Sequence, residues 1–103
     1  MGQSCYYIYI LFSDLHNKYY VGYTSNYMQR LIQHNEQEFF NTYTSKYRPW
    51  TLAVVFICGD KESMAIKIER FIKKQKSRKL IELLINPEFI PTGVLAQLVR
   101  VPH

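Results

Sequence analysis

Apolar and polar positions alternate in short blocks along the first quarter of the chain. Residues 6–12 and 19–23 are rich in aromatic and β-branched side chains, and the polar segment 14–18 separates them. Strands favour such side chains, and a short polar break between two of them is typical of a hairpin. The pattern therefore predicts two antiparallel strands, joined by a turn somewhat longer than the tightest ones.

A helical repeat follows the second of these strands. Residues 24–26 are Thr, Ser and Asn, which favour the position just before a helix, and the repeat continues to about Glu36. Its apolar positions Met28, Leu31 and Ile32 form one stripe. We expect this stripe to face the core.

A second stripe of the same predicted helix carries polar chemistry. At about 100° per residue, Tyr27, Arg30 and His34 fall beside the apolar stripe. Side chains at this border between core and solvent can be held in place and still reach water. Arg30 and His34 are therefore candidate site residues.

The remaining sequence predicts one more strand and two more helices. Residues 37–49 have no regular pattern, whereas residues 51–58 form a nearly continuous apolar run, which is typical of a buried central strand. Residues 61–76 and 78–85 have helical patterns. The apolar stripe of the first of these helices consists of Met64, Ala65, Ile68, Phe71 and Ile72. Three prolines and a glycine interrupt the final stretch, which we do not expect to join the core.

Length and composition fit a single small domain. The chain has 103 residues, of which 48% are hydrophobic, and only four glycines and four prolines. Such a chain can bury a modest core and is not typical of disordered proteins. We expect one domain over residues 1–85, followed by an irregular tail over residues 86–103.

The positive charge is concentrated in one segment. The net charge is +5, and residues 61–80 alone carry eight basic and two acidic side chains, or +6. A basic segment beside many aromatic side chains favours a polyanionic partner, with nucleic acid as the first candidate. The ordinary alternative is a solvated lysine face of a helix.

Several other kinds of site and partner are disfavoured. Cys5 and Cys58 lack the spacing of a zinc site, and His16, His34 and His103 form no cluster. We expect both thiols to be buried and unpaired, in a cytoplasmic protein. The apolar run of residues 6–12 is too short to span a membrane. No membrane and no obligate protein partner are expected, because the apolar stripe of the basic helix is needed to cover the sheet.

One carboxylate in the basic segment has a position suited to a site. Glu69 lies about 40° from Ala65 around the predicted helix, just off the apolar stripe. The alternative is an exposed helix residue that pairs with Lys73, four positions along the chain.

In order and spacing, these residues resemble the GIY-YIG nuclease family, in particular its small single-domain members. The resemblance covers about residues 5–80. It rests on Tyr7-Ile8-Tyr9, Tyr20-Val21-Gly22, Thr24, Arg30, His34-Asn35, Lys46-Tyr47-Arg48-Pro49-Trp50 and Glu69 within residues 65–74. The chain departs from the family pattern at Tyr7, which replaces glycine, and at Tyr23, where some members have a lysine that assists catalysis.

The resemblance implies a mixed α+β fold with a metal-dependent phosphodiesterase site. It implies a small three-stranded, mainly antiparallel sheet flanked by helices, in the order β-β-α-β-α(-α). Attack of water on a phosphodiester requires neutralisation of negative charge, which a hard divalent cation held by Glu69 supplies. Because Glu69 is the only well-placed carboxylate, we expect one ion, Mg²⁺ or Mn²⁺. Arg30 is expected to contact the phosphate with its planar, permanently charged guanidinium.

The identity of the general base is left open between three residues. Family members generally use a tyrosine from the two strand motifs, which makes Tyr9 and Tyr20 the candidates. Tyrosine has a reference pKa of about 10 and needs nearby cations to act as a base at pH 7. His34, with a reference pKa of about 6.5, could share or take the role.

The sequence therefore predicts a small metal-dependent endonuclease that hydrolyses DNA, with DNA repair as the expected context. The candidate catalytic residues are Tyr9, Tyr20, Arg30, His34 and Glu69. The candidate nucleic-acid contacts are Lys46, Arg48, Lys67, Arg70, Lys73 and Lys74. Trp50 is expected to pack beneath the third strand. The alternative is a non-catalytic nucleic-acid-binding module that uses the same basic and aromatic surface.

Overall fold

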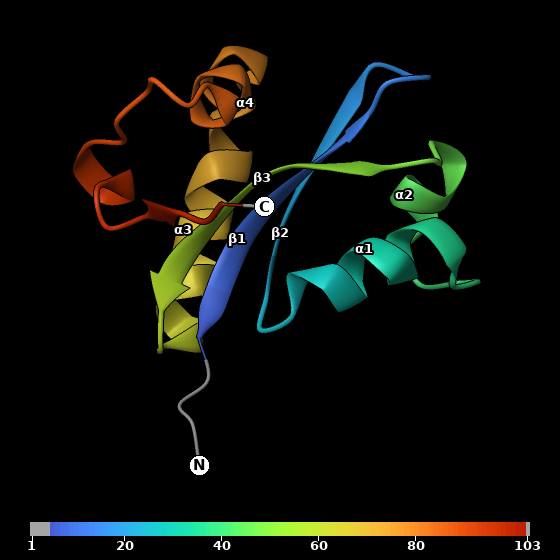
Figure 1. Cartoon of the computed structure of the whole chain (residues 1–103), viewed down its shortest axis with the longest axis horizontal. Helices are drawn as coiled ribbons and strands as arrows, with labels where there is room; N and C mark the ends of the chain where they lie inside the picture. Colours follow the sequence, from blue (N-terminus) through green and yellow to red (C-terminus); the bar gives the residue numbers. More distant parts are fainter. Residues whose placement is uncertain (1–4, 103) are drawn as a thin grey trace.

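A computed structural model of the chain describes residues 5–102 and shows a sheet with helices on both faces (Figure 1). The four strands, in the spatial order β2-β1-β3-β4, are all antiparallel to their neighbours. The strands are β1 (Tyr6–Ser13), β2 (Lys18–Thr24), β3 (Thr51–Gly59) and β4 (Val99–Arg100). The helices are α1 (Tyr27–Glu36), α2 (Thr42–Lys46), α3 (Glu62–Gln75), α4 (Arg78–Ile85) and the short 3-10 helix η1 (Gly93–Leu95).

The predicted hairpin and central strand are confirmed. β1 pairs with β2 from Tyr7 opposite Thr24 to Ser13 opposite Lys18, and its other edge pairs with β3. Four consecutive residues of β1, from Ile8 to Leu11, are buried. Such a run, without alternation, is expected where helices cover both faces of a sheet. β2 lies at the edge of the sheet.

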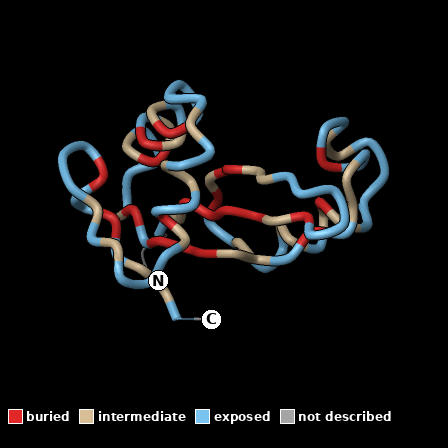
Figure 2. The backbone as a smooth tube through the Cα atoms, turned by 90° about the horizontal axis from the view of Figure 1, so that it is seen from above, coloured by how far each residue is buried: buried red, intermediate tan, exposed pale blue. Residues whose placement is uncertain are grey.

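Two groups of buried side chains hold the helices to the sheet. The main core joins the strands to α3 and α4 and includes Ala65, Ile68 and Ile72, which confirms the apolar stripe predicted for residues 61–76. The aromatic core lies on the other face, where α1 and α2 pack. It is built on Tyr9, Leu11, Trp50 and Val55. Figure 2 shows buried positions through the middle of the molecule and exposed positions around its periphery.

Helix α1 packs through only part of the predicted apolar stripe. Met28 and Ile32 are 53% and 55% exposed, so the prediction that they face the core is wrong. Leu31, the third residue of that stripe, packs against the aromatic core as predicted, together with Tyr27, and His34 is buried. The helix is turned this way because the hydrogen-bond partners of His34 lie beneath it.

Helix α2 and strand β4 were not predicted, and neither was the short helix η1. Residues 42–46 form α2 within the segment taken as irregular, where the Asn41 side chain accepts a hydrogen bond from the Thr44 amide. The expected sheet had three strands, but β4 pairs with Phe56 and Ile57 as a fourth. Elements of five and two residues are too short to show a periodic pattern.

The C-terminal segment contributes to the main core, so the prediction that it stays outside is wrong. Leu95 and Leu98 are 4% and 5% exposed and belong to the main core. The Arg100 guanidinium donates to the carbonyl oxygens of Leu84 and Asn86. Hydrophobic contacts and backbone acceptors hold this segment, and neither leaves a local sequence signature.

The expected state of the cysteines is only half confirmed. Cys5 and Cys58 are both free thiols, but only Cys58 is buried. Cys5 is exposed because it precedes β1 and lies outside the cover of the helices. His103 lies outside the described residues. Within residues 5–102, no helix has the length and apolar character that would let it cross a membrane.

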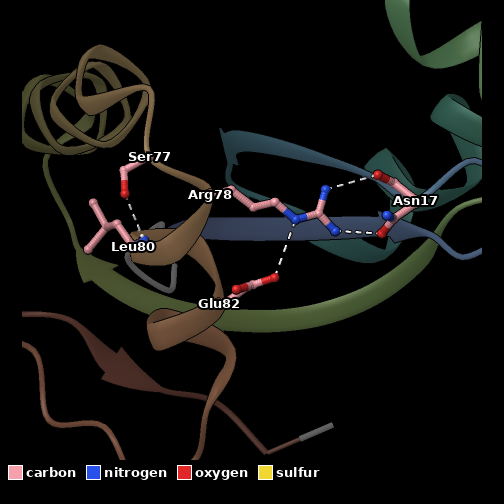
Figure 3. A network of polar contacts seen from close by, with 5 residues as sticks. All are labelled: Asn17, Ser77, Arg78, Leu80 and Glu82. Carbon is pink, nitrogen blue, oxygen red and sulfur yellow. Dashed lines mark hydrogen bonds and ion pairs between the residues drawn. The ribbon is translucent and has the colours of Figure 1, made fainter.

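Arg78 fastens the β1–β2 turn to α4 (Figure 3). Its guanidinium donates to the backbone and side-chain oxygens of Asn17, and also to Glu82. Asn17 has a φ of 55°, a left-handed conformation that asparagine tolerates better than most residues. These contacts hold the turn of the hairpin close to the layer formed by α3 and α4.

Candidate active site

A cavity of about 370 Å³ opens beside β2 at the edge of the sheet. We call it the edge cavity. Helices from both faces reach it, because within residues 5–102 no further strand lies beyond β2 to keep the two layers apart. Its lining includes all five residues expected from the sequence to be catalytic, namely Tyr9, Tyr20, Arg30, His34 and Glu69.

Gly22 makes room for the ring of Tyr9. The two residues are opposite each other in the pairing of β1 and β2. A Cβ atom on residue 22 would lie 2.5 Å from both Cζ and Oη of Tyr9, closer than atoms can pack. Tyr9 can therefore lie across β2 and line the cavity only because residue 22 has no side chain. The role of Gly22 was missed from the sequence, although a glycine inside a strand often marks a close approach of this kind.

His34 is held between a tyrosine and a threonine. Its Nε2 lies 2.8 Å from Tyr9 Oη, and its Nδ1 lies 2.9 Å from Thr44 Oγ1. Thr44 is buried and comes from α2, so the helix that the sequence did not reveal supplies the second partner. Both ring nitrogens are engaged, and His34 therefore acts on the cavity through Tyr9.

The His34 ring is neutral at pH 7. Burial, followed by the charges of Arg30, Arg48 and Lys73, lowers the pKa of His34 to about 4. A neutral imidazole has one donor and one acceptor nitrogen. With the proton on Nδ1, the ring donates to Thr44 Oγ1 and its Nε2 accepts from the Tyr9 hydroxyl.

The hydroxyls of Tyr9 and Tyr20 in the edge cavity are protonated at neutral pH. Burial raises the pKa of Tyr9 well above its usual range, Tyr20 raises it further, and Arg30 opposes the rise. Burial and then Glu69 raise the pKa of Tyr20. The Asn41 side chain opposes this second rise because it donates to Tyr20 Oη at 3.3 Å.

Glu69 lines the edge cavity and also pairs with Lys73. Its Oε2 atom lies 3.7 Å from Lys73 Nζ, and its side chain is 17% exposed. The pairing with Lys73 that was expected for an exposed Glu69 therefore occurs, but the side chain is half-buried and lines the cavity. Glu62, taken from the sequence as a helix-start residue outside the site, also lines the cavity. Its carboxylate accepts a hydrogen bond of 3.0 Å from the Tyr23 hydroxyl.

Arg30 lines the cavity with its charge unpaired. Its guanidinium carbon lies 5.3 Å from the centre of the Phe40 ring, and Nη1 donates to Gln33 at 3.4 Å. In the described part of the chain, ion pairs join only Lys73 to Glu69 and Arg78 to Glu82. The charge of Arg30 is therefore available to an anion.

The basic residues expected to bind nucleic acid lie on different surfaces. Lys67, Arg70 and Lys74 are exposed on α3, roughly 100–160° around the helix from Glu69. Lys46 is exposed at the end of α2. Lys73 lies next to Glu69 of the edge cavity, with which it forms an ion pair. Contacts between these residues and nucleic acid stay a prediction.

Arg48 has a structural role at the end of α1. Its Nε donates to the His34 carbonyl oxygen at 2.7 Å, and its Nη2 donates to the Gln37 carbonyl oxygen at 2.8 Å. Cationic donors commonly bind the last carbonyl groups of a helix in this way. The nucleic-acid contact expected for Arg48 also stays a prediction.

A metal ion in the edge cavity would have few protein ligands. Among residues 5–102, no group of three or more His, Cys, Asp or Glu side chains could hold a metal ion. Glu69 is the carboxylate of the cavity that does not bind a tyrosine hydroxyl. It is therefore the first candidate ligand.

The low pKa of His34 predicts a loss of stability in mild acid. The unfolded chain takes up a proton at this residue below a pH of about 6.5, whereas the folded protein does so only near pH 4. The contribution is therefore complete above pH 6.5 and is lost as the pH falls toward 4. The free energy of unfolding should decrease by up to about 1.4 kcal/mol per pH unit in this window.

Urea unfolding at pH 7 and pH 5 measures this effect. The wild type and His16→Gln, which changes an exposed histidine, should lose similar stability, and His34→Gln should lose much less. NMR titration of the His34 ring in the wild type gives the pKa directly, even if the variant does not fold. A His34 pKa near 6.5 would contradict the neutral, buried ring.

Comparison with known proteins agrees with the order of these residues. The model of the GIY-YIG catalytic domain matches residues 5–82, which is most of the chain. No curated protein matches the chain significantly. Proteins with this domain are generally nucleases that act on nucleic acid and use divalent metal ions. With its two tyrosine motifs on β1 and β2 and the matching domain over three quarters of its length, the chain belongs to the GIY-YIG family.

Proposed function

We propose that this protein is a metal-dependent endonuclease that hydrolyses DNA phosphodiester bonds. The observation that carries the proposal is the convergence of Tyr9, Arg30 and Glu69 on one cavity from β1, α1 and α3. Phosphodiester hydrolysis needs a cation for the phosphate, a group that handles a proton and a ligand for the metal. The edge cavity offers one side chain for each of these tasks.

The edge cavity suits one hard divalent cation, Mg²⁺ or Mn²⁺, held by Glu69. The carboxylate is largely shielded from solvent, and about 370 Å³ is enough for several of the waters that Mg²⁺ retains. When bound, such an ion neutralises charge on the phosphoryl oxygens and on the leaving oxygen. Glu62 is engaged by the Tyr23 hydroxyl, which supports Glu69 as the principal ligand.

Arg30 binds the phosphate in this proposal. Its guanidinium is partly buried and has no carboxylate partner within the described residues. Partial burial strengthens its attraction for the negative charge that grows on the phosphoryl oxygens in the transition state. Its planar donors can bind two oxygens at once.

Tyr9 handles the proton of the attacking water in this proposal, and His34 positions Tyr9. A tyrosine with a raised pKa can take a proton from water only if it passes its own proton on. The neutral His34 ring offers Nε2 as the acceptor, 2.8 Å from Tyr9 Oη. As the water proton moves to Tyr9 Oη, the Tyr9 proton moves to His34 Nε2. The other imidazole proton stays on His34 Nδ1 and keeps its hydrogen bond to Thr44 Oγ1.

Glu69→Gln tests the proposed function most simply. Labelled duplex, single-stranded and branched DNA, with RNA alongside, are incubated with Mg²⁺, Mn²⁺ or EDTA. We expect metal-dependent cleavage by the wild type and a loss of at least about 100-fold in Glu69→Gln, since the metal ligand is removed. Glu88→Gln makes the same change of charge at an exposed residue and should cleave normally.

Two results would contradict the proposal. Cleavage that persists in EDTA, or a Glu69→Gln protein as active as the wild type, would rule out the metal role of Glu69. If no nucleic acid is cut but the wild type binds it in a salt-dependent way, the non-catalytic binding module is the better description.

Tyr9→Phe and Tyr20→Phe distinguish the two candidate bases. General base catalysis contributes roughly 10²–10⁴-fold, so Tyr9→Phe should lower kcat by at least about 100-fold. Tyr20→Phe should lower kcat by less than about tenfold, because its hydroxyl is bound by Asn41 and not by an imidazole. Rates are compared between preparations with equal folded fractions, measured by circular dichroism. The opposite order of effects would assign the proton transfer to Tyr20.

A further inference from the structure

A second hollow continues the edge cavity along the same edge of the sheet. It has a volume of about 460 Å³, and we call it the edge groove. The cavity and the groove share Tyr20, and Lys73 of the groove pairs with Glu69 of the cavity. Together they follow β2 from Lys18 at its start to Thr24 at its end.

The edge groove is strongly basic. Its described lining contains no acidic side chain and four cations, namely Lys18, Lys73, Lys76 and Arg78. These residues come from β2, α3 and α4, which are brought together here by the fold. The basic run of residues 61–80 supplies three of them, and Lys18 of the hairpin could not have been grouped with them from the sequence.

Aromatic rings orient three of these cations. Lys73 Nζ lies 4.9 Å from the centre of the Tyr20 ring, Lys18 Nζ lies 5.3 Å from that of Tyr47, and Arg78 lies 4.8 Å from that of Tyr19. A cation held over a ring loses part of its freedom before any ligand arrives. The groove is thus a preformed surface for an anion.

The four cations differ in whether they already have a polar partner in the protein. Arg78 is engaged by Asn17 and Glu82, so it builds the wall of the groove (Figure 3). Lys73 is paired with Glu69. Lys18 and Lys76 belong to no ion pair in the described part of the chain and are both exposed. These two ammonium groups are the ones that a phosphate can reach.

We propose that the edge groove binds the nucleic-acid strand on one side of the phosphate held in the edge cavity, through the backbone phosphates of that strand. This inference rests on the proposed function. From Lys18 to Thr24 the edge strand spans about 20 Å along the groove and the cavity together, which matches about six nucleotide steps at 3.4 Å each. The groove is a different surface from the exposed face of α3, where Lys67, Arg70 and Lys74 lie.

Binding of a fluorescent single-stranded 20-nucleotide DNA, followed by anisotropy in EDTA over a range of salt concentrations, tests the proposal. The double variant Lys18→Gln/Lys76→Gln removes the two free cations of the groove. Lys61→Gln/Lys79→Gln makes the same change of charge at two exposed positions that neither line the groove nor belong to the predicted nucleic-acid contacts. All four lysines are exposed, so both variants should fold, which circular dichroism checks.

The groove variant should bind about tenfold or more weakly at roughly 0.1 M salt. Its plot of log affinity against log salt concentration should be less steep by about 1.4, which is two contacts with single-stranded DNA. The control variant should change affinity by less than about twofold. If the affinity of the groove variant for DNA is unchanged, or if the control variant loses as much affinity, the groove is not the binding surface.

Cleavage assays on the same preparations separate this inference from the proposed function. With metal present, the groove variant should raise KM and keep kcat, because its lysines touch no reacting atom. If the groove variant cleaves DNA with unchanged KM and unchanged affinity, the proposal that the groove binds the strand is wrong, whereas the proposed nuclease function is supported. If the groove variant binds DNA more weakly than the wild type but the wild type cleaves no DNA with any metal, the groove proposal is supported and the proposed nuclease function is wrong.

Discussion

The hydrogen bond between Tyr9 and His34 joins the parts of the candidate site. Tyr9 belongs to β1 and His34 to α1. Thr44, on the other side of the imidazole, belongs to α2. Breaking this chain would leave buried polar atoms without partners, at a cost of about 1–3 kcal/mol each. The arrangement also requires Gly22, since any side chain at that position would occupy the space of the Tyr9 ring.

The candidate site lies at the edge of the sheet, where the two helix layers come close to each other. In the described part of the chain no strand pairs with the outer side of β2, so residues from the two helix layers can meet around it. One layer brings Arg30 and the other brings Glu69, and neither helix needs to cross the sheet. An open edge usually needs protection from pairing with other chains, and charged side chains such as Lys18 give that protection. The same charges suit the phosphates of a nucleic acid.

The long elements and the order of the site residues could be predicted from the sequence. Strong periodicity gave the limits of α3 and α4, and the two tyrosine motifs predicted the hairpin that carries Tyr9 and Tyr20. The short elements could not be predicted, because α2 is too short to show a periodic pattern and β4 depends on a pairing partner that is distant in the chain. The rotation of α1 was missed for a related reason. Apolar spacing indicates Met28 and Ile32, but the buried partners of His34 decide which side faces inward.

The hydrogen-bond partners of the polar side chains could not be predicted from the sequence either. Arg48 looks like a phosphate ligand in a basic motif, yet its guanidinium binds carbonyl groups at the end of α1. Glu62 looks like an ordinary first-turn carboxylate, yet it lines the edge cavity beside Tyr23. Such roles depend on which side chains the fold brings within about 3 Å. Residue type and spacing alone do not contain that information.

DNA cleavage by Gly22→Ala is the most direct test of the claim that the site depends on the placement of Tyr9. The added methyl group should displace the Tyr9 ring, and a misplacement of about 1 Å can cost roughly 100-fold in rate. The account predicts a folded variant whose kcat falls by that order and whose His34 pKa moves from about 4 toward the value of a free imidazole. A folded Gly22→Ala protein that cleaves DNA at the wild-type rate would contradict it.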